Sequence, residues 1–520
     1  MNLLMQQIQT APDDFVFPDV DWAGLSPLLV MAGVPIFFLT VWSLTSHIAP
    51  RRTPSIVAVL AGIGTIVAAA IQWGRVSGDP VAGFSTLASA YSVDGFSMLV
   101  TILIAAAVTL TALFAHDYLE REEINSAEFF VLLMLSAAGG MVMAGANDLI
   151  VLFLGLEVLS IAVYILAASH VRRAESQEAG IKYFVLGAFA SAFLLYGIAL
   201  MYGATGSTNL VQISEWSVTL VANGDTGLMY GAMAFLLVGL AFKIAAVPFH
   251  AWTPDVYDGA PSPTVSFMAS AVKVAGFAGL LRVFSITLNT EELAGALSDD
   301  WAPMIFALAV LSMIYGAVVG VVQDNVKRML AYSSISHAGF ILVGVETATD
   351  DGLNAALYYL AAYTFIVIGS FAVISVASPK GDASHSLADY KGLAARKPIL
   401  AFAFTVLLLA QAGVPFTTGF LGKFFVIGAS IDSENYLLAI IAMVSAVIAA
   451  YLYLRIVLTM YNTGDEAEGA VTGTEPIPWT AALTIGLTVV FTVFFGIYAD
   501  LLVDLVGDAI PELVRETASG

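Results

Sequence analysis

The 520-residue sequence contains no cysteine, and only 11% of its residues are charged. Without cysteine the chain can form neither a disulfide nor a cysteine-ligated iron–sulfur cluster. The scarcity of charge, beside 59% hydrophobic residues, excludes an ordinary soluble globular protein. The sequence also has no polar stretch long enough to form a separate soluble domain.

Basic residues are scarce as well, with 19 Lys and Arg against 40 Asp and Glu and a formal net charge of −21. So acidic a chain is an improbable partner for nucleic acid. Because an excess of exposed carboxylates keeps a protein hydrated when salt screens its charges, the balance favours a halophilic source. The alternative is an acidic surface that docks basic partner subunits.

If the acidity is an adaptation to high salt, the activity of the protein should collapse at low ionic strength, because unscreened carboxylates repel one another. The measurement is activity against salt concentration at constant pH. Full activity at low ionic strength would contradict the halophilic origin.

Long apolar runs are what the sequence has in abundance. Windows of about twenty apolar residues, enough to cross about 30 Å of hydrocarbon, recur from end to end. They predict an all-α polytopic membrane protein with about fourteen transmembrane helices. The expected spans are residues 25–46, 55–74, 94–115, 127–146, 149–168, 181–203, 229–249, 261–284, 302–322, 329–346, 354–377, 399–429, 436–460 and 479–499.

The basic residues predict the orientation of these spans, because cytoplasmic loops retain Lys and Arg. Only Arg75, Arg282 and Arg515 lie on one side. Most lie on the other side: Arg51, Arg52, Arg121, Arg172, Arg173, Lys182, Lys327, Arg328, Lys380, Lys391, Arg396, Lys397 and Arg455. We therefore expect a multi-pass protein of the cell membrane with both termini outside.

Two similar segments predict an internal repeat. "AAVPFHAW" at 245–252 is echoed by "AGVPFTTGF" at 412–420, so that Pro248 and Pro415 stand in matching places. Each proline removes one helical hydrogen bond and frees a carbonyl, that of Ile244 or of Gln411. A freed carbonyl inside a membrane must meet protein or water, so helices 7 and 12 are expected to be broken beside a polar cavity.

This spacing divides the chain into four expected parts. Residues 1–126 would form transmembrane helices 1 to 3, 127–284 a first five-helix repeat, and 302–460 a second. Because five is odd, the second repeat would be inverted in the membrane relative to the first. Residues 461–520 would form an acidic loop and transmembrane helix 14.

Four charged residues fall near the middle of expected spans: Glu157, Lys243, Lys273 and Lys423. A charge at this depth costs about 2.5–3.5 kcal/mol even on insertion scales and usually marks an ion path. Burial favours the neutral form of a lysine and a nearby carboxylate the charged form, so Glu157 and Lys243 together could load and release a proton. A structural ion pair between helices is the alternative for any one of these residues.

Two histidines are further candidates. His250 directly follows the expected break in helix 7, where it could be an interfacial residue or a proton entry. His337, in "LAYSSISHAGF", lies among serines and a tyrosine. It could transfer protons, or it could pack helices through serine hydrogen bonds.

Several segments together resemble the proton-translocating, antiporter-like subunits of respiratory complex I, and are most similar to the subunit N type. These are "LGLEVLSIAVYIL", "FKIAAVPFHAWTPDVYDGAPSPTVSFMASAVKVAGFAGLLRVF", "NVKRMLAYSSISHAGFILVG" and "AGVPFTTGFLGKFFV". The wording "WTPDVYDGAPSPT" and Lys273 in the eighth span are similar to N rather than to L and M. The chain also ends soon after span 14, whereas subunit L continues into a long lateral helix.

The resemblance implies a role for each matching position. Glu157 and Lys243 would be the carboxylate and lysine of a first half-channel, Lys273 a connecting lysine, and Lys423 the terminal residue of a second half-channel. It also implies other complex I membrane-arm subunits as partners, beside the lipid bilayer and protons. Flavin, iron–sulfur clusters and the quinone site would belong to those partners, with no cofactor or metal in this chain.

Two other hypotheses are open at this point. A subunit of a Mrp-type sodium/proton antiporter would share the lysines and the broken helices. An inert membrane scaffold would use the charged residues only to tie helices together. Because membrane-bound hydrogenases and deazaflavin-dependent dehydrogenases contain similar subunits, the electron donor is also open.

Overall fold

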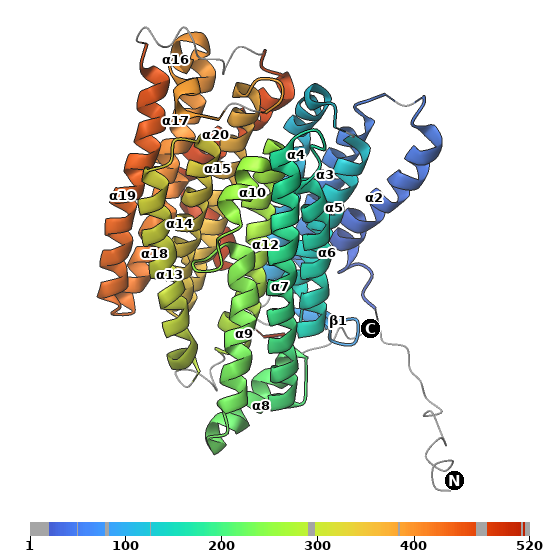
Figure 1. Ribbon diagram of the computed structural model, residues 1–520. Helices are drawn as coiled ribbons and strands as arrows, with labels where there is room; N and C mark the ends of the chain where they lie inside the picture. Colours follow the sequence, from blue (N-terminus) through green and yellow to red (C-terminus); the bar gives the residue numbers. More distant parts are fainter. Residues whose placement is uncertain are drawn as a thin grey trace.

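The computed structural model describes residues 20–48, 50–77, 83–124, 126–289, 297–382, 385–463, 476–510 and 513–514. Within these ranges, thirteen helices are long and apolar enough to cross a membrane. The twelfth expected span is present as two shorter helices, α17 (Pro398–Ala412) and α18 (Thr418–Asp432). The expectation of an all-α polytopic membrane protein is confirmed, and the helices stand side by side in one bundle (Figure 1).

The described residues between 20 and 244 form seven long helices and a hairpin of two short strands. The helices are α2 (Ser26–Thr45), α3 (Thr53–Val76), α4 (Gly95–Glu122), α5 (Ser126–Gly145), α6 (Leu149–Ala167), α7 (Ala174–Thr205) and α9 (Gly227–Ile244). The strands β1 (Phe84–Thr86) and β2 (Tyr91–Val93) pair antiparallel, and α8 (Leu210–Asn223) joins α7 to α9. The sequence did not predict the hairpin or α8, because neither reaches the length of a membrane span.

The eighth span is irregular. It begins after α10 (Thr253–Gly259) and is built of α11 (Ser262–Phe267), the π-helix η2 (Met268–Val272), α12 (Lys273–Leu280) and the π-helix η3 (Leu281–Thr287). Nearly the whole segment is buried in the bundle. Single turns of π-helix commonly lie at functional sites, and η2 ends directly before Lys273.

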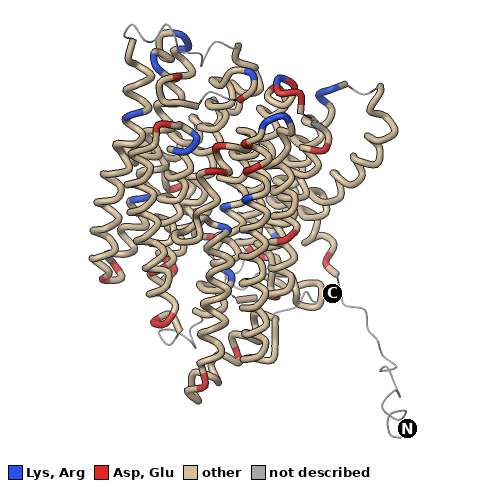
Figure 2. The backbone as a smooth tube through the Cα atoms, in the orientation of Figure 1, with Lys and Arg blue, Asp and Glu red and all other residues tan. Residues whose placement is uncertain are grey.

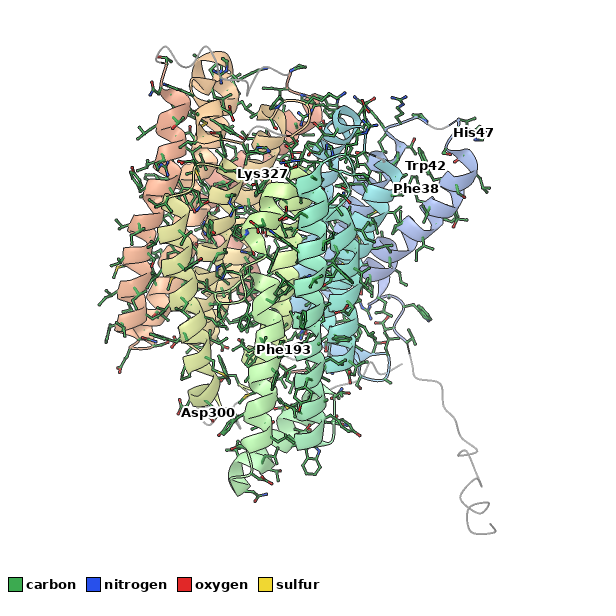
Figure 3. All side chains as sticks on the ribbon, in the orientation of Figure 1. Phe38, Trp42, His47, Phe193, Asp300 and Lys327 are labelled. Atoms are coloured by element: carbon green, nitrogen blue, oxygen red, sulfur yellow. The ribbon has the colours of Figure 1, made fainter. Side chains whose placement is uncertain are left out.

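The remaining long helices are α13 (Ser298–Val321), α14 (Val326–Glu346), α15 (Asp350–Ala377), α19 (Tyr436–Tyr461) and α20 (Trp479–Ile497). The short helices η5 (Leu387–Tyr390), α16 (Leu393–Arg396) and α21 (Asp500–Gly507) lie outside the spans. Nearly all of α14 and α15 is buried, whereas α2, α19 and α20 present wide apolar faces to the outside of the bundle. Phe38 and Trp42 on α2, and His47 just after it, follow one another at this periphery (Figure 3).

Glycines allow the closest helix crossings. A Cβ atom added to Gly139 on α5 would lie 2.7 Å from the carbonyl oxygen of Gly155 on α6. A Cβ on Gly339 of α14 would lie 2.8 Å from the carbonyl oxygen of Ala309 on α13. Small residues at such crossings let helix backbones touch, which is how helices associate tightly in lipid.

Both breaks expected at the prolines are present, although the seventh span ends earlier than expected. Helix α9 stops at Ile244, and Ala245 has a positive φ of 62°. Residues 245–249, which we assigned to the span, therefore lie in the break before α10. The inverted relation between the two repeats, and the division into four parts, stay predictions.

Lys and Arg gather at the upper end of the bundle in Figure 2. The described residues nearest the two termini lie together beside the hairpin, at the end of α4 opposite Arg121. The backbone N–H of Asp21 donates to Thr86 Oγ1 on β1, and Val514 lies close to Gly83. Which of these ends faces the cytoplasm stays a prediction. Arg515 and the acidic loop at 464–469 lie outside the described residues.

Candidate functional site

Lys243 lies one residue before the end of α9 and is only 3% exposed. Its Nζ atom donates to Ser160 Oγ on α6 at 2.8 Å and lies 3.4 Å from Tyr183 OH on α7. The rings of Tyr164 and Tyr183 approach the ammonium at 6.0 and 5.5 Å. A cavity of about 10 Å³ adjoins this group, which is room for about one water molecule.

Glu157 precedes Ser160 by one turn of α6, and its Oε1 atom is buried without a hydrogen-bond partner among the described residues. It interacts electrostatically with Lys243, but within the described ranges the two side chains form no direct ion pair. The Ser160 hydroxyl instead accepts a hydrogen bond from the Lys243 ammonium and donates its own hydrogen to Leu156 O at 2.5 Å. The lysine of the expected pair is therefore bonded to a serine of the helix that carries Glu157, a partner that the sequence did not indicate.

The break after α9 is held by backbone and side-chain donors. Ala245 and Ala246 donate to the last carbonyls of α9, and Trp252 Nε1 donates to Phe242 O at 3.2 Å. Val247 N donates to Ser312 Oγ on α13 at 2.8 Å. His250, inside the break, is half-buried and packs on the Tyr315 ring at 4.6 Å.

Lys273 is 2% exposed and lies against α14. Its Nζ atom donates to both the carbonyl and the hydroxyl of Ser334, at 2.5 and 2.6 Å. The Ser334 hydroxyl also lies 3.4 Å from Tyr257 OH on α10. Tyr257 contacts Trp252, which stacks on Tyr183 with ring centroids 4.4 Å apart. A line of aromatic and hydroxyl side chains thus runs from the Lys243 site to Lys273.

His337 lies one turn further along α14 and is bonded through both ring nitrogens. Nδ1 lies 2.8 Å from Tyr359 OH on α15, and Nε2 lies 3.0 Å from Tyr453 OH on α19. Tyr453 OH also lies 2.6 Å from Ser333 Oγ, and Ser333 Oγ donates a hydrogen bond to Gln411 Oε1 at 3.2 Å. The serines noted in the sequence do not bond to the imidazole directly; two tyrosines from distant segments do.

Lys423 lies on α18 and reaches back to the end of α17. Its Nζ atom donates to the carbonyls of Gln411 and Ala412 at 2.8 and 2.9 Å. The carbonyl of Gln411 is one of the two that we expected proline to free, and the ammonium is its partner. The negative end of the α17 dipole adds to this stabilisation. A Cβ atom on Gly413, where φ is +92°, would lie 3.1 Å from Lys423 Cδ, so both backbone and space favour glycine there.

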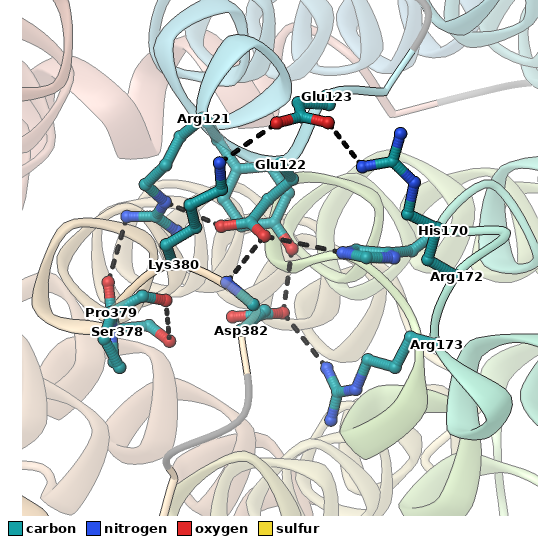
Figure 4. A network of polar contacts seen from close by, with 12 residues as sticks. Arg121, Glu122, Glu123, His170, Arg172, Arg173, Ser378, Pro379, Lys380 and Asp382 are labelled. Atoms are coloured by element: carbon teal, nitrogen blue, oxygen red, sulfur yellow. Dashed lines mark hydrogen bonds and ion pairs between the residues drawn. The ribbon is translucent and has the colours of Figure 1, made fainter.

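A second polar cluster, at the end of the bundle rich in Lys and Arg, was not predicted as a site. Its centre is Asp382, a fully buried residue after α15. Lys327 Nζ, itself fully buried, lies 2.7 Å from Asp382 Oδ2, and Tyr118 OH donates to the same oxygen at 2.8 Å. Arg173 and Ser262 approach the carboxylate at 3.4 Å each. Side chains from α4, α11 and α14, and from the residue that caps α7, therefore meet at one carboxylate. Figure 4 shows Asp382 beside Arg173.

The charge of Asp382 is held by its neighbours. Burial alone would raise the pKa of this carboxyl, but Lys327 and His385 outweigh burial and hold the pKa well below its usual range. The exposed Glu123 nearby is bonded to Arg172 and Lys380, which lower its pKa to about 2. Both carboxylates are therefore charged at neutral pH. In the sequence, Lys327 and Arg173 indicate only the orientation of the chain, because no local pattern pairs them with Asp382.

The fold and the row of buried lysines define an antiporter-like membrane subunit. The family described as "NADH:quinone oxidoreductase/Mrp antiporter, TM" matches residues 146–449, more than half of the chain. NADH-quinone oxidoreductase subunit N 1 of Herpetosiphon aurantiacus is 40% identical over 481 residues, covering 91% of this chain and 93% of that protein.

Solved structures give the same result. A chain of respiratory complex I from Thermus thermophilus with bound aureothin has a TM-score of 0.76 and 31% identity, over 92% of this chain and 99% of that one. A chain of the Mrp complex from Dietzia sp. DQ12-45-1b has a TM-score of 0.79 over 94% of this chain and 98% of that one. At 21% identity this second likeness shows the fold alone. The chain belongs to the subunit N family of NADH-quinone oxidoreductases, as the resemblance predicted.

Proposed function

We propose that this chain is a membrane-arm subunit of a complex I-like NADH-quinone oxidoreductase, in which it moves protons outward as quinone is reduced. The observation that carries this proposal is the row of buried lysines across the bundle, two of which, Lys243 and Lys273, are bonded to serine hydroxyl groups. Electron transfer would take place in partner subunits that hold the flavin, the iron–sulfur clusters and the quinone site. The enzyme is then a translocase to which this chain contributes no redox centre.

Each buried group has a part in the proposed path. Glu157 modulates Lys243, which loads a proton in the first half of the chain; its bond to Ser160 and the adjoining small cavity support this role. Lys273 connects the halves through Ser334. Lys423, on carbonyls of a broken helix, ends the second half. His250, half-buried in the first break, is the proposed entry group.

His337 joins the second half of the path. Its two tyrosine bonds favour proton transfer over simple helix packing, because both ring nitrogens lie on hydroxyl groups that can donate and accept. The energy must come from elsewhere in the complex, since moving one charge against 100 mV requires about 2.3 kcal/mol. We place the chain in the cell membrane, with the end rich in Lys and Arg in the cytoplasm and both termini outside.

The proposal is tested by replacing Lys423 with methionine in the intact complex. Methionine keeps most of the volume but removes the charge, so we expect proton uptake into inverted membrane vesicles to fall about tenfold or more. Quinone reduction with NADH is measured in parallel, after the subunit is shown to assemble. Exposed Lys380, whose surface ion pair contributes little, gives the control variant Lys380→Met. Normal pumping by an assembled Lys423→Met complex would contradict the proposal.

A Mrp-type sodium/proton antiporter subunit is the second candidate, supported by the fold of the Dietzia complex. It differs in its driving reaction, because an antiporter exchanges ions without reducing quinone. Proton uptake that requires NADH and stops with a quinone-site inhibitor supports the oxidoreductase. Sodium-driven proton movement in the absence of NADH would favour the antiporter.

A further inference from the structure

Donor and acceptor can be assigned for each hydrogen bond that leads to His337, starting from Ser370, which is bonded to a backbone carbonyl. Ser370 donates its one hydroxyl hydrogen to Ile366 O at 2.8 Å. Its Oγ atom must then accept from the Gln411 side chain, whose Nε2 lies 3.0 Å away. This assigns the orientation of the amide, so that Oε1 of Gln411 faces Ser333.

The donors and acceptors of the next hydrogen bonds, as far as the His337 imidazole, are assigned in the same way. Because Gln411 Oε1 can only accept, Ser333 donates its hydrogen there, and its Oγ atom accepts from Tyr453. Tyr453 has then given its one hydrogen, and its oxygen must accept from Nε2 of His337. Nε2 therefore carries a hydrogen in both the neutral and the charged ring, and cannot be the atom that gains or loses the proton.

Proton exchange is left to Nδ1, which lies 2.8 Å from Tyr359 OH. In the neutral ring Nδ1 accepts from Tyr359, and in the charged ring Nδ1–H donates to it. The Tyr359 ring faces α18, because a Cβ atom on Gly422 would lie 2.9 Å from Tyr359 Cδ2. Gly422 directly precedes Lys423, so the hydroxyl that serves Nδ1 belongs to a ring packed against the residue before the lysine.

We propose that the two tyrosines have different roles: Tyr359 carries the proton to and from His337 Nδ1, whereas Tyr453 is a positioning residue that anchors Nε2. The inference rests on the proposed proton translocation and deepens it. In the transfer, the Tyr359 hydroxyl hydrogen passes to Nδ1 while the phenol oxygen takes a proton from the Lys423 ammonium across bridging water, because no direct hydrogen bond joins these two described side chains. Lys423 becomes the neutral amine, His337 becomes the imidazolium, and Tyr359 ends unchanged.

The surroundings of His337 fit this step. Two of the three Lys423 N–H bonds go to backbone carbonyls, which leaves one for transfer. The other ionisable side chains that face the ring are Lys273 of α12, Tyr363 of α15 and Tyr453 of α19. Lys273 is already bonded to Ser334, and Tyr363 stacks on the imidazole with centroids 4.7 Å apart instead of bonding to its nitrogens.

The experiment compares Tyr359→Phe, Tyr453→Phe and Ser333→Ala in the intact complex. Proton uptake and quinone reduction are measured in vesicles in H₂O and in D₂O. For Tyr359→Phe we expect uptake to fall about tenfold or more, with a larger solvent isotope effect, because a hydroxyl that transfers the proton is lost. Loss of the anchor in the other two variants should cost about threefold, with an unchanged isotope effect.

Tyr358→Phe is the matched control, because the neighbouring Tyr358 donates to Phe495 O on α20 rather than to His337. Its uptake and isotope effect should equal those of the unmodified complex. If Tyr359→Phe does not assemble, the anchor variants decide: an unchanged isotope effect supports the assignment, and a raised one overturns it.

The Lys423→Met variant distinguishes a failure of the proposed proton relay from a failure of the roles assigned to the two tyrosines. If Lys423→Met abolishes uptake but Tyr359→Phe and Tyr453→Phe behave alike, the relay stands and the assignment of the tyrosines is wrong. If Lys423→Met pumps normally, the relay itself is wrong and the assignment fails with it.

Discussion

Replacing Lys243 with alanine is expected to abolish proton uptake, with quinone reduction either lost or uncoupled from it. The ammonium is buried beneath the Tyr164 and Tyr183 rings and is bonded to Ser160, so no exposed group can substitute for it. We expect uptake to fall about tenfold or more, as for other ionisable residues on intramembrane proton paths. The measurement compares NADH-dependent quinone reduction with proton uptake into vesicles that contain the assembled complex.

A second variant distinguishes lost charge from lost packing. Lys243→Met fills much of the same space, so both variants should lose pumping alike if the ammonium carries the proton. A complex that pumps normally with methionine but not with alanine would make Lys243 a packing residue. Loss of the assembled subunit in both variants would support the scaffold hypothesis, in which the charged residues only tie helices together.

Replacing Asp382 with alanine is expected to destabilise the subunit more than any other single change at the end rich in Lys and Arg. The change leaves the fully buried Lys327 ammonium without its counter-charge and the Tyr118 hydroxyl without its acceptor. Removing one partner of a buried ion pair costs about 3–5 kcal/mol. The readouts are the amount of subunit in the assembled complex and its thermal stability in detergent.

The exposed Asp225, on the loop after α8, gives the control variant Asp225→Ala, for which little change is expected. A double variant, Asp382→Leu with Lys327→Met, removes both charges and should recover part of the lost stability. Equal stability of Asp382→Ala and the unmodified chain would show that the cluster does not hold the helices together.

The pH dependence of this cluster follows from the lowered pKa of Asp382. A carboxyl whose pKa is lower in the folded protein stabilises the fold above its unfolded pKa of about 3.9, and this contribution is lost as pH falls through the folded value. Because the folded value is well below the usual range, the cluster should hold through the whole neutral and mildly acidic range. Loss of assembly between pH 6 and pH 5 would therefore come from other groups.

Much of the architecture could be predicted from the residues alone. Spans in lipid must satisfy every backbone group internally and must be long enough to cross, so apolar runs predict helices with few alternatives. The prolines located both breaks, and the unusual depth of Lys243, Lys273 and Lys423 marked them as candidates. These signals are local in the chain, which is why a sequence reveals them.

Local sequence signals could not predict where the seventh span ends or which residues bond to the buried groups. Pro248 indicated a break but not that α9 stops at Ile244, because the cap depends on Ala245 adopting a positive φ. Lys243 bonds to Ser160 only because α6 and α9 pack at a particular rotation. Tyr359 and Tyr453 lie in apolar runs with other tyrosines close by, so the sequence does not distinguish them.

By itself, the sequence determined that this is a membrane protein of many helices, broken at two prolines and carrying charges where lipid would not tolerate them. Those properties depend on composition and on spacing along one helix. Only the tertiary structure decided that Lys423 binds carbonyls of α17, that Asp382 joins four helices, and that His337 lies between two tyrosines. These contacts join different helices, and their geometry is fixed by how whole helices pack.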